Sequence, residues 1–190
     1  LKGPFQKPIL DGNVVVEGYK FREWTVRHAE GSARLDVQNQ VAEFRGLRVE
    51  IGESTATVSG TTNLDGTSIN LRIQSDHVRA EDFASVIKEN ISGVVSGDVT
   101  VTSLNSLRFS GRVSATRLAA RGHTLDTFSG DVTYNEPVIQ VRNATASEFG
   151  ANVRAESFEF NSSTGNLNMT ADLGSLSFTR LREFGVPETI

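Results

Sequence analysis

Three histidines and one pair of adjacent acidic residues are the first candidates in this 190-residue sequence for metal binding or proton transfer. His28, His77 and His123 lie far apart, and none has a second ligand at the short spacing that metal sites use. We therefore expect no metal, and we interpret His28 and His77 as strand-end or turn residues. The pair Glu81–Asp82 opens a short segment of helical spacing, where carboxylates stabilise a helix N-terminus, so we assign it to capping and not to acid–base catalysis.

Composition and glycine spacing exclude several other functions. The segment Gly93–Gly97 has the wrong spacing for a phosphate-binding or dinucleotide motif, and no nucleophile elbow occurs. The absence of cysteine excludes disulfides and thiolate zinc sites. The net charge of -4 is mixed in sign, with no basic cluster among aromatic residues, so nucleic-acid binding is not indicated. We predict no catalytic residue, no metal and no cofactor, and we expect the chain not to be an enzyme.

Alternation of apolar and polar residues runs through most of the chain and predicts β-strands. Thr67–Ile73 alternates strictly, and Leu47–Ile51 places aliphatic side chains on one face and charged side chains on the other. Asn63–Gly66 is a hairpin signal, and Glu30–Ser32 is predicted to be a turn between two further strands. About a dozen strands with a turn signal every 8–12 residues or so favour an antiparallel sheet over parallel crossovers.

One stretch of the chain occurs twice. Thr67–Ile87 joins an alternating strand to a segment of helical spacing, and Thr164–Phe184 repeats this arrangement, with Leu167 98 positions after Ile69. The chain opens on Leu1 without a methionine, and we interpret it as a fragment of a longer protein. We predict two β-repeats of one continuous sheet, 1–92 and 93–190, each ended by a short helix, at 79–87 and at 177–184.

The apolar faces of the predicted strands contain many small residues. A closed β-sandwich is the ordinary alternative, but sheets packed face to face lie about 10 Å apart and need bulky side chains from both faces. Small residues could also be accommodated by strong sheet twist or in a tapered barrel. We favour a curled, open antiparallel sheet, because a flexible acyl chain could fill the space that small residues leave. These small residues are Gly97, Gly111, Gly130, Ala115, Ala144, Ala146 and Ala155.

A family resemblance supports the open sheet. Leu1–Val14 resembles the phrase G-x-x-x-x-P-x-L-x-G-x-V of the AsmA/TamB-like superfamily, and Leu107–Leu118 is a second phrase of that kind. The strands closed by Phe178–Phe184 are similar to the repeat unit of that family, so the resemblance covers nearly the whole chain. It implies a taco-shaped sheet with an apolar inner groove. It also implies a long protein of a diderm bacterium that is anchored in the inner membrane and reaches across the periplasm.

The resemblance also implies a function without catalytic residues or cofactors. Members of the family are implicated in moving phospholipid to the outer membrane, and TamB-like members also in assembling outer-membrane β-barrels. The expected partners are phospholipid acyl chains, an outer-membrane β-barrel assembly protein, and the inner membrane through a part outside this chain. A second hypothesis is a scaffold that captures another chain by strand addition at an open sheet edge. The residues expected to line the groove are Ile69, Leu71, Ile73, Val99, Val101, Phe109, Val113, Val132, Ile139, Val141, Leu167 and Met169.

Overall fold

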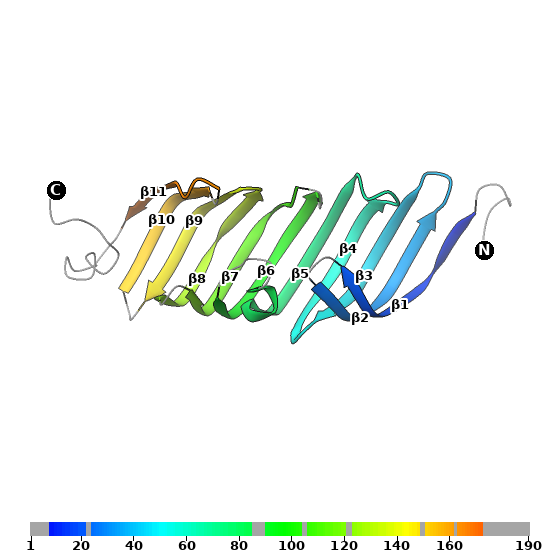
Figure 1. Cartoon of the computed structure of the whole chain (residues 1–190), viewed down its shortest axis with the longest axis horizontal. Coiled ribbons are helices and arrows are strands. Elements are labelled where there is room, and N and C mark those ends of the chain that lie inside the picture. The colour runs from blue at the N-terminus through cyan, green and yellow to red at the C-terminus, as the bar shows by residue number, and fades with distance from the viewer. Residues whose placement is uncertain are drawn as a thin grey trace.

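The computed structural model describes residues 8–21, 24–84, 90–103, 106–120, 123–148, 151–161 and 163–172. These residues form one antiparallel sheet of eleven strands, in which each strand pairs with the strands before and after it in the sequence (Figure 1). Strands β1 and β11 lie at opposite ends of this sheet (Figure 1). The strands are β1 (Ile9–Phe21), β2 (Trp24–Asp36), β3 (Val41–Ile51), β4 (Ser54–Asn63), β5 (Ile69–Arg79), β6 (Ile91–Ser103), β7 (Arg108–Ala120), β8 (His123–Asn135), β9 (Val138–Glu148), β10 (Ala151–Asn161) and β11 (Leu167–Asp172).

The alternation that predicts β5 is reproduced in the exposure of its side chains. Ile69 is buried and Leu71 and Ile73 are half-buried, whereas Asn70 and Arg72 between them are exposed. A side chain of a strand points to the face opposite that of its neighbours, so the sequence pattern assigns one apolar and one polar face to the sheet. The prediction of a single antiparallel sheet is confirmed, and the described strands do not close into a barrel.

The closed β-sandwich that we considered as an alternative is not supported. All described strands belong to one sheet, and among the described residues no second sheet packs against it. No large side chain in the described part of the chain is less than 2% exposed. A sandwich would bury large side chains between its layers. Instead, the buried apolar residues are mostly small: Ala29, Ala80, Ala115 and Ala144, with Ile69, Val101 and Val141.

The prediction of two short helices needs correction. In the segment 79–87, Ala80–Phe83 forms a single 3-10 turn, η1, and residues 85–87 lie outside the described chain. The second segment, 177–184, also lies outside the described residues. Short 3-10 turns are frequent as connectors between regular elements. Helical spacing over so few residues therefore identified a connector between β5 and β6 and did not show that a complete α-helix forms.

The sequence repeat has a counterpart in the order of the strands. Strands β7 to β11 begin 97–99 residues after β1 to β5, respectively. The matching strands β1 and β7 both contain 13 residues, as do β2 and β8, and β3 and β9 both contain 11. Between the two sets of five strands lie η1 and β6.

The polar face carries charges of alternating sign in cross-strand register. One ion pair on this face joins β5 to β6: Nε of Arg72 donates to Oδ1 of Asp98 at 2.8 Å. Opposite charges that face each other across a sheet are favourable and like charges are not, so these pairs help to fix the register. The central row runs from β5 to β9 through Gln74, Asp98, Arg112, Asp131 and Arg142.

We expect acidification to destabilise the sheet, because folding lowers the pKa values of carboxyl groups on the polar face. Hydrogen bonds from the side chains of Arg72 and Arg45 are the main causes of the lowered pKa values of Asp98 and Glu43. A folded pKa below the unfolded one gives stability that is present above the unfolded pKa, about 4. This stability is lost as the pH falls through the folded pKa.

The urea concentration at half-unfolding should therefore fall as the pH is lowered from neutral to about 3. Asp98→Asn is the matched variant, because it removes one of these carboxyl groups from the titration. Its unfolding midpoint should depend less on pH than that of the unmodified chain. A midpoint that does not change on acidification would contradict this explanation.

Candidate functional site: the apolar face

Apolar side chains of successive strands lie directly opposite one another on one face of the sheet, which we call the apolar face. This arrangement follows from the register, because paired residues of antiparallel strands share a face. One row comprises Leu71, Val101, Phe109, Tyr134, Ile139 and Phe160, and the backbone pairing continues it to Leu167. The next row comprises Val58, Ile73, Val99, Gly111, Val132, Val141, Phe158 and Met169.

The register brings all twelve predicted lining positions to this face. Leu167 is placed there only by its backbone pairing with Phe160. The sequence analysis missed residues of β8 and β10, namely Tyr134, Phe158 and Phe160. The alternation Phe158-Glu159-Phe160 was the signal that could have identified the two β10 residues, because it repeats the period of two seen in β5. With β10 included, the two rows are continuous from β5 to β11.

No described element covers the apolar face, and many of its side chains remain accessible to solvent. Val101 and Val141, in the middle of the rows, are 6% and 7% exposed, whereas Met169 in the last strand is 55% exposed. Most of the other members are half-buried. Neighbouring side chains of the sheet shield one another in part, but they leave a surface that an apolar ligand could still bury.

The aromatic pair of Phe109 and Tyr134 strengthens the first row. The two ring centroids lie 5.4 Å apart, and the ring planes are tilted by 34°. This separation is within the range of favourable aromatic pairs. Burial is the main cause that raises the pKa of the Tyr134 hydroxyl above its ordinary value. Tyr134 is therefore neutral at physiological pH and does not add a charge to the apolar face.

The glycines of the apolar face allow neighbouring strands to approach closely. A Cβ atom at Gly111 would lie 2.1 Å from the carbonyl oxygen of Asp98 and 2.6 Å from the Cα of Val99. A Cβ atom at Gly97 would lie 2.7 Å from the carbonyl oxygen of Arg112. Side chains avoid such distances, so the strand geometry here requires glycine. Gly97 and Gly111 thus serve close strand approach, a reason for small residues on this face that the sequence analysis did not give.

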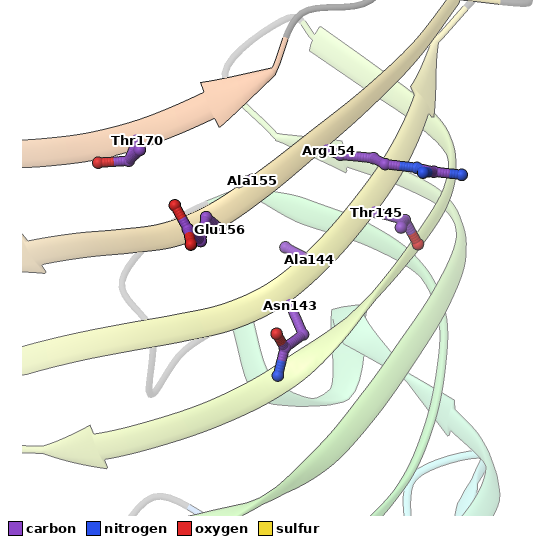
Figure 2. Close-up of a pocket in the computed structure, with 7 residues that line it drawn as sticks. All are labelled: Asn143, Ala144, Thr145, Arg154, Ala155, Glu156 and Thr170. Carbon is purple, nitrogen blue, oxygen red and sulfur yellow. The ribbon is translucent and has the colours of Figure 1, made fainter.

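A hollow of about 620 Å³ lies over β9, β10 and β11 (Figure 2). Ala144 and Ala155 are paired in register at this place and leave room above them. The pairing is interrupted nearby, where β9 shifts against β8 and β10 shifts against β11. Polar groups of β9 to β11 complete the lining. Two of them have described hydrogen bonds: Nδ2 of Asn143 donates to Oδ2 of Asp131 at 2.9 Å, and Oγ1 of Thr145 lies 3.0 Å from Oγ of Ser129. The lining residues are Asn143, Ala144, Thr145, Arg154, Ala155, Glu156 and Thr170.

The acidic pair lies in the first turn of η1, as predicted, but Asp82 also makes contacts that the sequence analysis did not predict. The N-cap residue, Arg79, which precedes the turn, makes no capping bond through its side chain. Oδ2 of Asp82 instead accepts hydrogen bonds from the backbone N–H groups of Glu53 and Ser54, at 3.0 and 2.9 Å, and from Oγ of Ser54 at 2.6 Å. Gly52 leaves the space for this carboxylate, since a Cβ atom there would lie 2.1 Å from Oδ1. Asp82 therefore attaches η1 to the turn between β3 and β4.

The histidines do not gather into a site. His28 lies in β2 with Nδ1 3.8 Å from Glu17 and Nε2 3.6 Å from Glu30, and His77 is exposed in β5 opposite Thr55. His123 begins β8, where its backbone pairs with Ala120. Within the described ranges, no group of three or more histidine or carboxylate side chains is placed to hold a metal ion.

The fold and the apolar face define a class of protein: a single-layer antiparallel β-sheet with one polar and one apolar face. Comparisons with protein-family models, with curated proteins and with solved structures found no match to this chain. Over the residues that the structure describes, no helix has the length and apolar character needed to cross a membrane.

Proposed function

We propose that this chain is a non-enzymatic segment of a hydrophobic groove that shields acyl chains during phospholipid transport between the inner and outer membranes. The apolar face forms the inner wall of this groove, and the twelve predicted lining residues contact the acyl chains. The resemblance to the AsmA/TamB-like superfamily supports a location in the periplasm of a diderm bacterium. There it belongs to a longer protein that is anchored in the inner membrane.

The observation that carries this proposal is the continuity of the apolar rows without a covering layer. Rows that cross the sheet from β5 to β11 present apolar side chains at every strand, spaced by the interstrand distance of about 4.8 Å. A row of this kind offers the same apolar contact at each step along the sheet. An acyl chain can therefore move along it without losing its shield from water.

The energetics favour an acyl chain as ligand over a polar one. Burial of each methylene group contributes about 0.8 kcal/mol, and an acyl chain needs no specific hydrogen-bond partner. The two rows from β5 to β11 contain no charged residue. A polar ligand on the same surface would lose hydrogen bonds to water without replacement, at a cost of about 1–3 kcal/mol for each group.

Mass spectrometry of the chain purified without detergent from a bacterial periplasmic extract tests the proposal. We expect phospholipid to remain bound, because its acyl chains are more stable on the apolar face than in water. The lipid should be displaced by a fluorescent fatty acid added in excess. If the purified chain carries no lipid and does not bind the fatty acid, the proposed groove does not exist.

The second candidate function is a scaffold for outer-membrane β-barrel assembly or secretion. The observation that favours it is the pair of sheet edges: among the described strands, β1 and β11 each pair with one neighbour only. An edge strand can capture an extended segment of another chain by adding it to the sheet. Crosslinks from an incoming outer-membrane strand would then concentrate on β1 or β11 and not on the rows of the apolar face.

A further inference from the structure

Two opposite charges line the hollow over β9, β10 and β11 without pairing with each other. Arg154 and Glu156 lie on either side of Ala155 in β10, and both side chains are exposed. Within the described part of the chain, neither side chain makes an ion pair or a hydrogen bond. Figure 2 shows that the two side chains point in different directions from the strand. The hollow therefore offers one free guanidinium and one free carboxylate.

The same sequence spacing gives ion pairs elsewhere in the sheet. In β3, Glu43 and Arg45 pair at 2.8 Å, and Arg48 and Glu50 pair at 3.4 Å. Residues two positions apart share a face of a regular strand, which brings their side chains within reach of each other. A feature of β10 must therefore keep its two charges apart.

A β-bulge in β10 separates the two charges. The register of β10 on β11 shifts between Ala155 and Ser157, so Glu156 between them is the extra residue. Bulges change the direction of a side chain and are frequent beside active sites. The neighbouring strand is also irregular here, because the register of β9 on β8 shifts between Ser129 and Asp131. Two neighbouring irregularities thus lie at the hollow, and the one in β10 turns the carboxylate away from the guanidinium.

The first repeat provides an internal comparison. Strands β3, β4 and β5 correspond to β9, β10 and β11, and they carry a hollow of about 210 Å³ whose lining includes Arg48 and Ala56. The guanidinium of Arg48 is ion-paired with Glu50 of the same strand. The hollow of the second repeat is about 620 Å³, and its guanidinium, that of Arg154, has no partner among the described residues. The free charges and the larger volume are therefore not general consequences of the repeat.

The hollow lies over the sheet and not at its end. Six of its seven lining residues belong to β9 and β10, and both of these strands are paired on both sides. Its volume is within the range of about 300–1,000 Å³ that is usual for small-molecule sites. Amide and hydroxyl groups of Asn143, Thr145 and Thr170 complete the polar lining. This lining suits a small polar ligand that carries charge.

We propose that the hollow binds a small zwitterion that carries a phosphate group and a primary ammonium group. The guanidinium of Arg154 binds the phosphate, because its planar N–H donors match two phosphate oxygens in a bidentate contact. The carboxylate of Glu156 accepts a hydrogen bond from the ammonium, which has three N–H donors. Phosphoethanolamine is the simplest ligand that carries both groups.

The two free charges together select a zwitterion. Inorganic phosphate would be attracted by Arg154 and repelled by Glu156, and ethanolamine would meet the opposite combination. Exposed ion pairs are individually weak, so either charge alone gives little binding. A zwitterion pairs with both charges, and its second contact forms when the first already holds the ligand in place. The affinity should therefore depend on both residues.

The same chemical group occurs in free phosphoethanolamine and in the head group of a phospholipid. The inference does not rest on the proposed acyl-chain groove, because every residue that it uses lines the hollow. A head group would add a polar contact to the transport proposed above, whereas a free zwitterion would be a separate, soluble ligand.

Isothermal titration calorimetry of the full chain with four probes tests the site. We expect phosphoethanolamine to bind at least about tenfold more tightly than inorganic phosphate or ethanolamine. Phosphocholine should also bind about tenfold more weakly, because its quaternary ammonium has no N–H donor for Glu156. Equal affinities for phosphoethanolamine and inorganic phosphate would overturn the inference. The absence of binding at about 10 mM phosphoethanolamine would do the same.

Three variants assign the two contacts. Arg154→Gln should weaken the binding of phosphoethanolamine about tenfold or more, and Glu156→Gln should reduce the preference over inorganic phosphate to less than about twofold. Both side chains are exposed, so both variants should keep the circular dichroism spectrum of the unmodified chain. Arg48→Gln, in the hollow of the first repeat, is the matched control and should bind as the unmodified chain does. Unchanged binding by Arg154→Gln would contradict the site.

Lipid nanodiscs distinguish the two sources of the ligand. If the head group is the ligand, nanodiscs of phosphatidylethanolamine should bind the chain more tightly than nanodiscs of phosphatidylcholine, and free phosphoethanolamine should compete. If the ligand is a free zwitterion, calorimetry detects phosphoethanolamine but neither nanodisc binds. A chain that binds both nanodiscs equally and does not bind phosphoethanolamine would refute the zwitterion site and leave the acyl-chain groove in place. A chain that binds phosphoethanolamine but no fatty acid would show the reverse.

Discussion

Replacement of Gly111 by alanine is expected to destabilise the chain by about 2–3 kcal/mol, which is large for the addition of one methyl group. The added Cβ would lie 2.1 Å from the carbonyl oxygen of Asp98, an atom of the neighbouring backbone that no side-chain rotation can move away. Strands β6 and β7 would have to separate at this point. Urea unfolding followed by circular dichroism measures the loss.

Gly12→Ala is the matched control for Gly111→Ala. Gly12 lies in β1, the strand that corresponds to β7 in the sequence repeat, and a Cβ atom there would meet nothing within 4 Å. Alanine loses less conformational entropy than glycine on folding, so this variant should be neutral or more stable by up to about 1 kcal/mol. Equal effects of the two substitutions would show that close strand approach is not the reason for glycine at position 111.

The faces of the strands could be predicted from the sequence because their signal is local. In β5, apolar and polar residues alternate from Ile69 to Ile73. Successive side chains of a strand point to opposite faces, so this alternation assigns each residue to one face of the sheet. The positions of the twelve lining residues follow from the same rule. Which of these residues lie directly opposite one another on neighbouring strands depends on the register of the strands. The short hairpin turns restrict this register, but the sequence analysis did not derive it.

The error at Glu30–Ser32 has a physical cause. Glycine between polar residues is a turn signal, but Gly31 lies inside β2. A Cβ atom at Gly31 would lie 2.7 Å from the Cα of Leu47, so glycine serves close strand approach here and not a change of direction. An isolated glycine in an alternating pattern has both interpretations. Only the neighbouring strand, which is distant in sequence, distinguishes between them.

The role of Asp82 could not be predicted for a similar reason. Its sequence neighbours indicate a helix terminus, whereas its hydrogen-bond donors come from Glu53 and Ser54, almost thirty residues earlier. The contact exists because strands of an antiparallel sheet run alternately up and down, so the turn between β3 and β4 lies at the same strand ends as η1, which connects β5 to β6. Local patterns predict which face a residue occupies, and the topology determines which distant groups it meets.

Substitution of Leu71 by aspartate is expected to abolish lipid binding by the chain. Leu71 is a half-buried member of the first row of the apolar face, opposite Val101 on β6. An acyl chain on this row would cover the new carboxylate, and removal of an ionised carboxylate from water costs several kcal/mol when it has no partner. Each 1.4 kcal/mol weakens binding about tenfold, so the amount of bound phospholipid should fall at least tenfold. Lipid extraction and mass spectrometry measure this amount.

Asn70→Asp distinguishes a local effect from an effect of net charge. Asn70 precedes Leu71 on the same strand but is exposed on the polar face, opposite Thr61, and its substitution adds the same negative charge. It should retain the lipid of the unmodified chain. Circular dichroism must show that both variants keep their strands, because a carboxylate in an apolar row could also weaken the sheet. If folded Leu71→Asp binds as much lipid as Asn70→Asp, acyl chains do not lie on the apolar face. Strand addition at the sheet edges would then be the function to test, because β1 and β11 each pair with one neighbour only among the described strands.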